Sequence, residues 1–469
     1  MANYANIFSK YIFSVIIKKL GEDMLNIELG EKRVTKADIR SYYESGFKPV
    51  DDVKIGLEYE RLPIFEVTGE NVPYSHEYGI CNLLRKFATL DNWDYITDDF
   101  NIIGLKKDNQ TITLEPGAQI EYSLAPVEKI SQIKDEIEKL DNIMSKLLDD
   151  YGISLINYGV SPFVTYKNIN LIPKHRYKIM AKYLWGILSD VMMRETAGIQ
   201  CCIDYTSEED ASRKFVLANK IVPFMTAMLA NSPIRGGVET GYKSFRALSW
   251  LNTDNDRCGF AFNLDEEFSF DTYIDKVLKT PIIFLNKEDL PLEMNGRINF
   301  ATFLDKGFEG FEPSLTDYKL HANLCFPEVR LNKFIEIRNQ DCVNKDLLLA
   351  SIAMYKGLLY SSSAMDEVEE LFKAFKHLDF SEMRYEVPRY ALQSRIGHVK
   401  VVDIAKELYK IAEKSLKSQR TGEVKYLTPL KQYVMKGITP ADVILKNWHG
   451  AWNKDAKKLL RYLVKESSF

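Results

Sequence analysis

Two glutamates stand two residues apart in an alternating segment of the chain. Glu58 and Glu60 lie within Lys54 to Glu60, where the residues alternate in the manner of a β-strand. Side chains two apart on a strand project from the same face, so these carboxylates would repel each other unless a cation lay between them. Magnesium suits such a pair because it takes oxygen ligands. A solvated strand face is the alternative, since this spacing is common.

A second pair of acidic residues flanks a predicted turn. The Pro-Gly turn at 116–117 separates two alternating segments, 111–115 and 119–124. Glu115 would hang at the end of the first strand, and Glu121 would lie on the polar face of the second. This polar face could bind a ligand or could simply be exposed to solvent.

Polar residues in two further segments could hold an anion. Gln200 lies on one face of the alternating segment 199–204. Arg246 and Arg257 lie beside a polar loop, and two arginines can clamp a carboxylate through paired hydrogen bonds. A half-buried strand and a plain surface loop are the structural alternatives.

The segment from Phe326 to Asp341 is the most informative. Glu336 and Arg338 share one face of a strand predicted over Lys333 to Arg338. Such a pair can be a simple cross-strand ion pair. It can also place a metal-binding carboxylate beside a guanidinium that neutralises a transferring phosphoryl group.

Several other solutions for catalysis and phosphate binding are missing from the sequence. No Cys/His or Ser/His nucleophile pair can be recognised, and neither a Walker loop nor a glycine-rich dinucleotide loop is present. The six histidines are too few and too scattered to suggest a zinc enzyme. The remaining possibility is a nucleotide site on a sheet of which one face carries glutamate and arginine side chains.

A mixed α+β fold around a largely antiparallel sheet must position these residues. The chain has 469 residues and is 46% hydrophobic, so it can bury a large core. Strand-like segments and long helical patterns alternate over about 53–341, whereas about 343–469 is helical. We therefore predict one catalytic domain over 1–469, with the active site in the sheet-containing core. Helix starts are predicted at Thr35 and Thr439.

The charge and the cysteine pattern limit the classes of partner and the cellular compartment that we expect. Lys+Arg 62 against Asp+Glu 66 gives a net charge of −4, which provides no electrostatic footprint for nucleic acid or an anionic membrane. The six cysteines form no C-x-x-C pair and predict reduced, buried thiols. The apolar run from Tyr11 to Ile17 is too short to cross a bilayer, and no targeting signal is legible, so a cytoplasmic location is expected.

Six ordered motifs resemble one family, the plant and proteobacterial glutamate–cysteine ligases. The motifs are GLEYER, LEPGAQIEYS, TAGIQCCID, SPIRGG, SFRALSWLNTDNDRCGF and FPEVRLNKFIEIRNQD, and the resemblance runs from about Ile55 to Asp341, then more weakly to the C-terminus. It implies a glutamine synthetase-like catalytic domain, shared with the guanidino kinases, in which an antiparallel sheet forms a bowl flanked by helices.

The resemblance also implies the reaction. ATP and two or three Mg²⁺ ions would convert the glutamate γ-carboxylate to a γ-glutamyl phosphate, and the amino group of L-cysteine would attack it. The product would be γ-glutamylcysteine, the first intermediate of glutathione-type thiol synthesis. The implied partners are these small molecules. Nothing in the sequence indicates the oligomeric state.

Residue roles follow from the same resemblance. The implied metal ligands are Glu58, Glu60, Glu115, Glu121 and Glu336. The implied catalytic arginines are Arg330 and Arg338, which with Lys333 would also bind ATP. Glutamate would be held by Arg246, Arg257 and Gln200.

The sequence departs from the family pattern in three motifs. Tyr59 stands where the family usually has histidine, Ala118 follows the Pro-Gly turn, and Cys202 lies between Gln200 and Asp204. Tyr59 and Cys202 could reshape the pocket for another amine acceptor. A catalytically silent regulatory relative and a guanidino phosphotransferase are the remaining alternatives.

Overall fold

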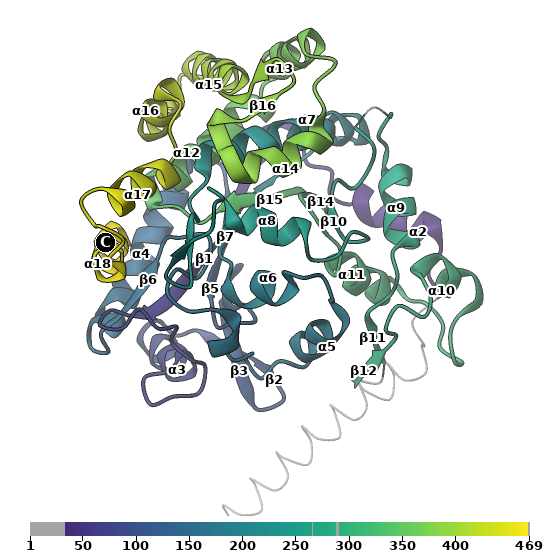
Figure 1. Cartoon of the computed structure of the whole chain (residues 1–469). Helices are drawn as coiled ribbons and strands as arrows, with labels where there is room; N and C mark the ends of the chain where they lie inside the picture. Colours follow the sequence, from purple (N-terminus) through teal and green to yellow (C-terminus); the bar gives the residue numbers. More distant parts are fainter. Residues whose placement is uncertain (1–32, 265, 288–289, 468–469) are drawn as a thin grey trace, which may run out of the picture.

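A nine-stranded antiparallel sheet forms the centre of this computed structural model, which describes residues 33–264, 266–287 and 290–467 (Figure 1). The strand order is β14-β15-β7-β1-β5-β4-β3-β2, and β6 pairs with the C-terminal part of β1. The strands are β1 (Ile55–Phe65), β2 (Asp94–Asp98), β3 (Asn101–Lys107), β4 (Gln110–Leu114), β5 (Ile120–Val127), β6 (Ile153–Ile156), β7 (Gly198–Ile203), β14 (Val329–Leu331) and β15 (Ile335–Asp341). The mixed fold with a largely antiparallel sheet is therefore confirmed.

The sheet has one apolar and one polar face because its side chains alternate. On β1, Leu57 and Tyr59 are buried on one face, and Glu58 and Glu60 project from the other. The antiparallel register places Glu60 opposite Glu121 of β5, so the polarity matches across strands. Strand pairing thereby collects carboxylates from distant segments on one face.

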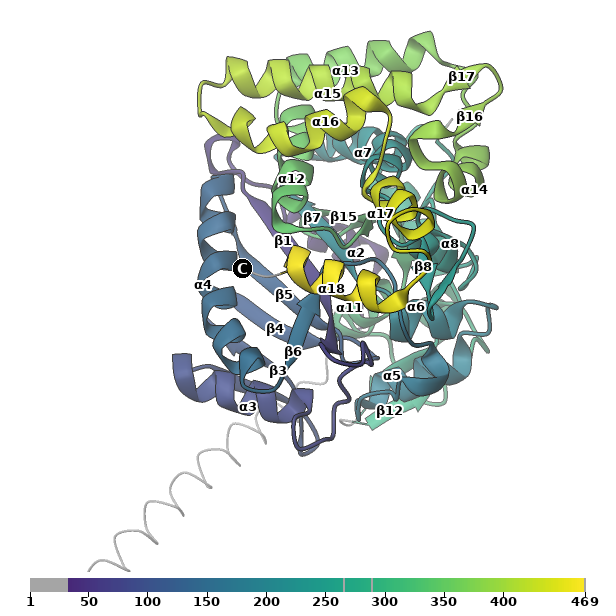
Figure 2. The same cartoon turned by 60° about the vertical axis from the view of Figure 1, so that its left-hand side comes forward.

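Helices cover the apolar face of the sheet. They are α3 (Ile80–Asp91), α4 (Ile130–Asp149), α12 (Lys345–Leu359) and α18 (Ala456–Ser467). Figure 2 shows α4 running beside the strands. Its buried residues recur at helical spacing and include Ile133, Ile137, Leu140 and Met144.

A buried ion pair lies in this apolar layer. Arg61, the last residue of the first motif, pairs with Asp141 of α4 at 2.8 Å, and neither side chain is accessible to solvent beyond a few per cent. The rings of Tyr59 and Tyr122 lie 4.7 and 4.6 Å from the guanidinium carbon. Arg61 therefore fastens α4 to the sheet and takes no part in the polar face.

Other helices surround the polar face and the edges of the sheet. Those beside the polar face are α5 (His175–Tyr183), α6 (Ser189–Glu195), α8 (Phe245–Leu251) and α11 (Leu315–Asn323). The long helix α7 (Glu208–Leu229) packs against β15. The remaining helices are α2 (Lys36–Glu44), α9 (Phe270–Lys279), α10 (Phe300–Lys306), α13 (Ser362–Ala374), α14 (Phe380–Tyr390), α15 (Val401–Ser418), α16 (Thr428–Lys436) and α17 (Pro440–His449).

Short two-stranded pairs connect these helices. They are β8 (Ile234–Arg235) with β9 (Val238–Glu239), β10 (Cys258–Gly259) with β13 (Phe326–Pro327), β11 (Phe284–Lys287) with β12 (Leu290–Glu293), and β16 (Arg395–Ile396) with β17 (Val399–Lys400). Only the β10–β13 pair is parallel among those described. It joins the loop after α8 to the strand segment that leads into β14.

Both predicted helix starts are confirmed. Thr35 caps α2 and Thr439 caps α17, each in a reciprocal capping box, and Pro440 is the first residue of α17. The five predicted strands are all present, although β2, β3, β6 and β14 of the sheet were not expected from the sequence. The single-domain organisation stays a prediction.

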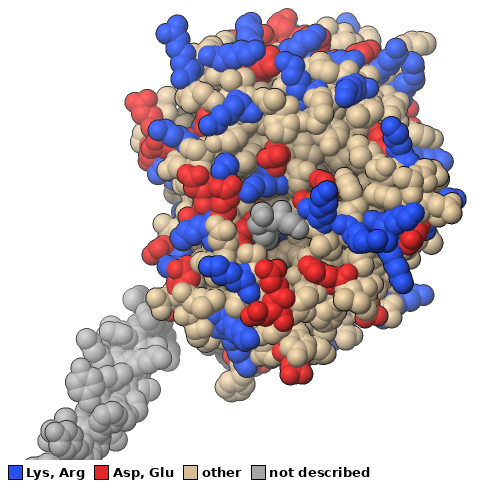
Figure 3. All heavy atoms as spheres, turned by 90° about the vertical axis from the view of Figure 1, so that its left-hand side faces the viewer, with Lys and Arg blue, Asp and Glu red and all other residues tan. Residues whose placement is uncertain are grey.

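The outer surface carries charges of both signs. On the face shown in Figure 3, Lys and Arg are interspersed with Asp and Glu. Across the described residues, no helix is long and apolar enough to cross a bilayer. The apolar run from Tyr11 to Ile17 lies outside the described residues. All six cysteines are free, and Cys201, Cys325 and Cys342 are buried.

Candidate active site

The polar face of the sheet lines a cavity of about 400 Å³. All five glutamates predicted to bind metal lie in its wall, namely Glu58, Glu60, Glu115, Glu121 and Glu336. They come from β1, the turn between β4 and β5, β5 itself and β15. Gln200, Arg330 and Arg338 line the same cavity, so the strands bring eight of the predicted site residues together.

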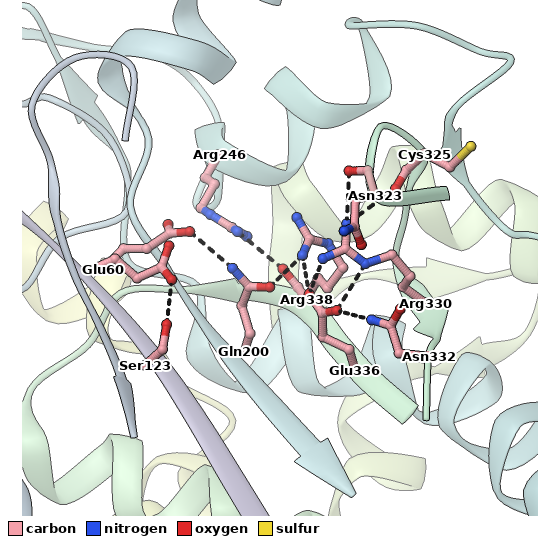
Figure 4. Close-up of polar contacts among 11 residues, drawn as sticks. Glu60, Ser123, Gln200, Arg246, Asn323, Cys325, Arg330, Asn332, Glu336 and Arg338 are labelled. Atoms are coloured by element: carbon pink, nitrogen blue, oxygen red, sulfur yellow. Dashed lines mark hydrogen bonds and ion pairs between the residues drawn. The ribbon is translucent and has the colours of Figure 1, made fainter. Parts of the chain in front are cut away.

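Hydrogen bonds fix two of the carboxylates, the first from the neighbouring strand β7 and the second from within β5 (Figure 4). Glu60 accepts hydrogen bonds from the backbone N–H of Gly198 at 2.6 Å and from Nε2 of Gln200 at 3.1 Å. Ser123 donates to Glu121 at 2.7 Å. The contacts of Glu60 follow from the register of β1 with β7, and the contact of Glu121 follows from the two-residue period of β5. They hold the carboxylates in the cavity wall.

Glu336 lies between two arginines at the other end of the cavity. Arg330 binds it through two hydrogen bonds, from Nε at 2.9 Å and from Nη2 at 2.8 Å. Arg338 donates from Nη1 to the same carboxylate and to Oε1 of Gln200. Arg338 lies in a β-bulge of β15, between Ile337 and Gln340. Both guanidinium groups are therefore held where an anion could share them.

The electrostatic environment separates Glu336 from the other glutamates. Burial, together with the neighbouring Glu336 carboxylate, raises the pKa of Glu58 to about 8. Burial also raises the pKa of Glu60 and of Glu121. For Glu336, burial opposes ionisation, but its two arginine partners outweigh burial and hold its pKa below the ordinary value. Additional positive charge in the cavity would favour ionisation of the first three.

The donor set in the cavity consists of carboxylate oxygens and fits magnesium. In the described part of the chain, no three of these carboxylates bring oxygen atoms within 4.8 Å of one another. Magnesium is usually held by one or two carboxylates with phosphate oxygens and water, so a bound nucleotide would complete such a site. The exposed group of Asp98, Asp99 and His175 does meet that distance but lies outside the cavity.

Arg246 lies behind the cavity wall. It extends from α8 and is only 1% exposed. Its Nη2 donates to the backbone carbonyl of Arg338 at 3.1 Å, but its Nε and Nη1 have no hydrogen-bond partner in the described structure. Trp250, one turn further along α8, lines the cavity and also has an unpartnered Nε1–H. Buried donors without partners are costly, so these groups indicate a missing acceptor.

Arg257 and Lys333 lie outside the cavity. Arg257 is buried and bonds Asp254 at 3.0 Å and the backbone carbonyl of Leu324 at 3.2 Å. Its other donors reach the backbone carbonyl of Pro281 and the hydroxyl of Tyr183. Lys333 is exposed on the turn before β15. The structure therefore does not bring these two residues to the other predicted contacts.

Helix α5 adds cavity residues that the motifs did not include. Lys174, Arg176 and Tyr177 lie opposite the β4–β5 turn, and Tyr177 donates to Glu115 at 3.2 Å. Burial and the neighbouring Arg176 lower the pKa of Lys174. The available signal was a run of basic residues after Pro173 at a helix start.

Two residues that depart from the family pattern lie away from the cavity wall. The idea that Tyr59 reshapes the pocket is wrong, because Tyr59 lies on the apolar face and its hydroxyl bonds Asn157. The two-residue period of β1 that exposes Glu58 and Glu60 necessarily turns Tyr59 away. Cys202 is half-buried beside Glu336 but does not line the cavity.

A family model and several plant proteins that resemble this chain all carry the description glutamate–cysteine ligase. The sequence model of a family described as "Glutamate-cysteine ligase family 2 (GCS2)" matches residues 54–460. Glutamate–cysteine ligase B, chloroplastic, of Oryza sativa subsp. japonica is 31% identical over 92% of this chain and 87% of its own length. The chloroplastic glutamate–cysteine ligases of Nicotiana tabacum and Medicago truncatula are 32% and 33% identical, again over 92% of this chain, covering 83% and 85% of their own lengths.

One solved structure supports the fold. Glutamate–cysteine ligase of Francisella tularensis, crystallised in complex with AMP, aligns with a TM-score of 0.56 over 90% of both chains at 14% identity. This likeness concerns the fold, because the identity is low. It agrees with a mixed fold of helices around a largely antiparallel sheet.

The relatives contradict the predicted cytoplasmic location. All three plant relatives above carry chloroplastic names. The prediction relied on the lack of a legible targeting or transmembrane signal, but transit peptides have no apolar segment and are recognised by an amphipathic composition rich in Arg and Ser. A search for apolar segments does not detect this kind of targeting signal.

Proposed function

Because the chain belongs to the glutamate–cysteine ligase family 2, we propose that it joins the γ-carboxylate of glutamate to the amino group of L-cysteine while ATP is cleaved to ADP and phosphate. One observation carries the chemistry: five glutamates and two arginines from separate strands converge on one cavity. Relatives named for this reaction match nearly the whole chain.

In the first step, a γ-carboxylate oxygen of glutamate attacks the γ-phosphorus of ATP. The bond from that phosphorus to the bridging oxygen of ADP breaks, and γ-glutamyl phosphate forms. Two anions must approach each other, so positive charge around them lowers the barrier. Arg330 and Arg338 supply it from the end of the cavity where Glu336 holds them.

In the second step, the amine of cysteine attacks the acyl carbon. The carbon–oxygen bond to the phosphate breaks, phosphate leaves, and the amine nitrogen loses a proton as the amide forms. No protein nucleophile is needed, because the acyl phosphate is already activated. Arg246 and Gln200 are the residues that we assign to glutamate, and the unpartnered donors of Arg246 support this role.

Magnesium ions are part of this proposal. Glu58, Glu60, Glu115 and Glu121 would hold them, with Glu336 at the arginine end of the cavity. When bound, magnesium neutralises charge on the nucleotide phosphates and on glutamate. Roles for Arg257 in binding glutamate and for Lys333 in binding ATP remain predictions, since both lie outside the cavity.

Phosphate release tests the proposed reaction. The full chain is incubated with ATP, Mg²⁺ and glutamate, with and without cysteine, and the product is identified by mass. Release that needs both amino acids and yields a γ-linked dipeptide supports the proposal. Removal of magnesium with a chelator should abolish release, and added Mg²⁺ should restore it.

The identity of the acceptor is tested in the same assay with a panel of amino acids. Release that depends on glutamate but not on cysteine would keep the scaffold and replace the acceptor. No release from folded protein that binds ATP would favour a regulatory relative. A phosphorylated guanidino product would indicate a phosphotransferase.

A further inference from the structure

Asp341 is a buried carboxylate at the end of β15 that the proposed chemistry does not use. It is 1% exposed. Its Oδ2 accepts hydrogen bonds from the backbone N–H of Asn231 at 2.8 Å and from the hydroxyl of Ser232 at 2.7 Å. Its Oδ1 accepts a hydrogen bond from the hydroxyl of Ser244 at 2.7 Å. Three donors from two segments thus converge on one side chain.

The two serine hydroxyls connect Asp341 to the first turn of α8. Because each hydroxyl donates its hydrogen to Asp341, its lone pairs remain free to accept. Ser244 caps α8 and accepts from the backbone N–H of Ala247 at 3.1 Å. Ser232 accepts from the backbone N–H of Arg246 at 3.2 Å. Asp341 therefore orients the first turn of the helix that carries Arg246.

Asp341 also places a negative charge near the Arg246 guanidinium. Burial lowers the pKa of Arg246, and the charges of Glu60 and Asp341 oppose that shift. No ion pair joins Asp341 to Arg246 among the described residues, since amide and hydroxyl donors occupy the carboxylate. The charge thus acts on Arg246 without using its Nε–H and Nη1–H groups.

Tight backbone packing keeps the two side chains in this arrangement. A Cβ atom at Gly159 would lie 2.7 Å from Cγ of Asp341. A Cβ atom at Gly198 would lie 2.3 Å from Nη2 of Arg246. Only glycine permits the chain to approach each side chain so closely, and this close approach limits the movement of both side chains.

We propose that Asp341 is the positioning residue of the glutamate site. It holds the first turn of α8 and supplies countercharge near Arg246, and it leaves two Arg246 donors available for a substrate carboxylate. This inference rests on the proposed function, in which Arg246 binds glutamate. It assigns Asp341 no contact with either substrate.

The substitution Asp341→Asn tests the charge because it keeps the size and one acceptor oxygen. We expect the KM for glutamate to rise about tenfold while the KM for ATP stays within about twofold. The double variant with Arg246→Lys should raise the KM for glutamate by less than the product of the single effects, since both act on one contact. A purely structural role would change both KM values together.

Asp317→Asn is the matched control. Asp317 is equally buried, accepts from Ser314 and Lys287 at the start of α11, and lies outside the cavity. We expect it to lose stability with both KM values unchanged. An unchanged glutamate KM in folded Asp341→Asn, or an equal rise in both KM values, would overturn the inference.

A second variant covers the case in which Asp341→Asn does not fold. Ser244→Ala removes one bond to Asp341 and the cap of α8 but keeps the charge. The glutamate KM should then rise about threefold with the ATP KM unchanged, and no change would overturn the inference. Wild-type protein that fails to consume glutamate and cysteine would instead contradict the proposed function, so the two failures are distinguishable.

Discussion

Single residues in the cavity differ mainly in how their charge is balanced. Glu58 has no ion pair among the described residues, and its pKa is raised to about 8. Glu336 has two guanidinium partners, and its pKa is lowered. These two glutamates, which we propose as metal ligands, should therefore respond differently to substitution.

Replacement of these two glutamates tests that difference. Glu58→Gln and Glu336→Gln are each expected to reduce phosphate release at least ~100-fold. Glu58→Gln should leave the free energy of unfolding unchanged or higher, because burial beside Glu336 already disfavours the charged form of Glu58. Glu336→Gln should lower it by about 2 kcal/mol, because it leaves buried guanidinium groups without a countercharge.

Chemical denaturation of both variants measures the stability effect, and the exposed Glu70→Gln serves as the control. Turnover close to wild type at saturating Mg²⁺ for either cavity variant would remove that glutamate from the metal site.

Arg246 provides a second prediction at this scale. Lysine keeps the charge but cannot place two parallel N–H groups on a carboxylate. Arg246→Lys should therefore raise the KM for glutamate about tenfold and leave the KM for ATP nearly unchanged. Initial rates over a range of each substrate measure both constants. A glutamate KM equal to that of wild type would show that Arg246 does not hold this substrate.

Among the elements, α5 connects the β2–β3 hairpin to the cavity. Its first residue, His175, donates from its backbone N–H to Asp98 at 2.6 Å and contacts Asp98 again from Nδ1 at 3.1 Å. The same helix carries Arg176 and Tyr177 into the cavity wall. The position of these side chains therefore depends on an anchor outside the cavity.

Loss of that anchor should loosen α5 specifically. Asp98→Ala removes the acceptor of the first helical N–H, which costs about 1 kcal/mol locally. Amide hydrogen exchange in α5 should increase about fivefold, while exchange in the sheet stays unchanged. Asp379→Ala is the control, because Asp379 is the N-cap of α14 and accepts from the backbone N–H of Glu382 at 2.9 Å, so its loss should increase exchange in α14 and not in α5. Equal exchange in wild type and Asp98→Ala would contradict the anchoring role.

For the whole molecule, stability also depends on buried groups that do not line the cavity. His321 on α11 is fully buried, and its ring stacks on Phe300 with the centroids 5.1 Å apart. Its Nε2 contacts the backbone carbonyl of Val277 at 3.0 Å, so this nitrogen carries the hydrogen. Burial lowers the pKa of His321 to about 3. The folded protein thus keeps this ring neutral at a pH where the unfolded chain protonates it.

This shift predicts a loss of stability in acid. Above the unfolded pKa near 6.5 the contribution is fully present, and it is lost as pH falls toward the folded value. At pH 5 the loss should be about 2 kcal/mol relative to pH 7.5. Urea unfolding of wild type and His321→Gln at both pH values measures it. The wild type should lose about 2 kcal/mol more than the variant, and equal pH dependence would contradict the prediction.

The sequence by itself determined which residues share a face within each element. Alternation along β1 placed Glu58 and Glu60 on one face, and capping patterns at Thr35 and Thr439 located two helix starts. These features depend on local periods and on contacts within four residues, so they can be deduced without a fold.

Only the tertiary structure decided which of these faces meet. It separated Arg257 from the cavity, brought Lys174 of an unpredicted segment into it, and placed Asp341 beside the loops that hold Arg246. The residues that these contacts bring together are far apart in the sequence: Asn231 and Asp341 are separated by 110 positions, and Tyr177 and Glu115 by 62. Such contacts arise from strand pairing and helix packing, which local periodicity does not specify, because the same alternation is compatible with many strand orders.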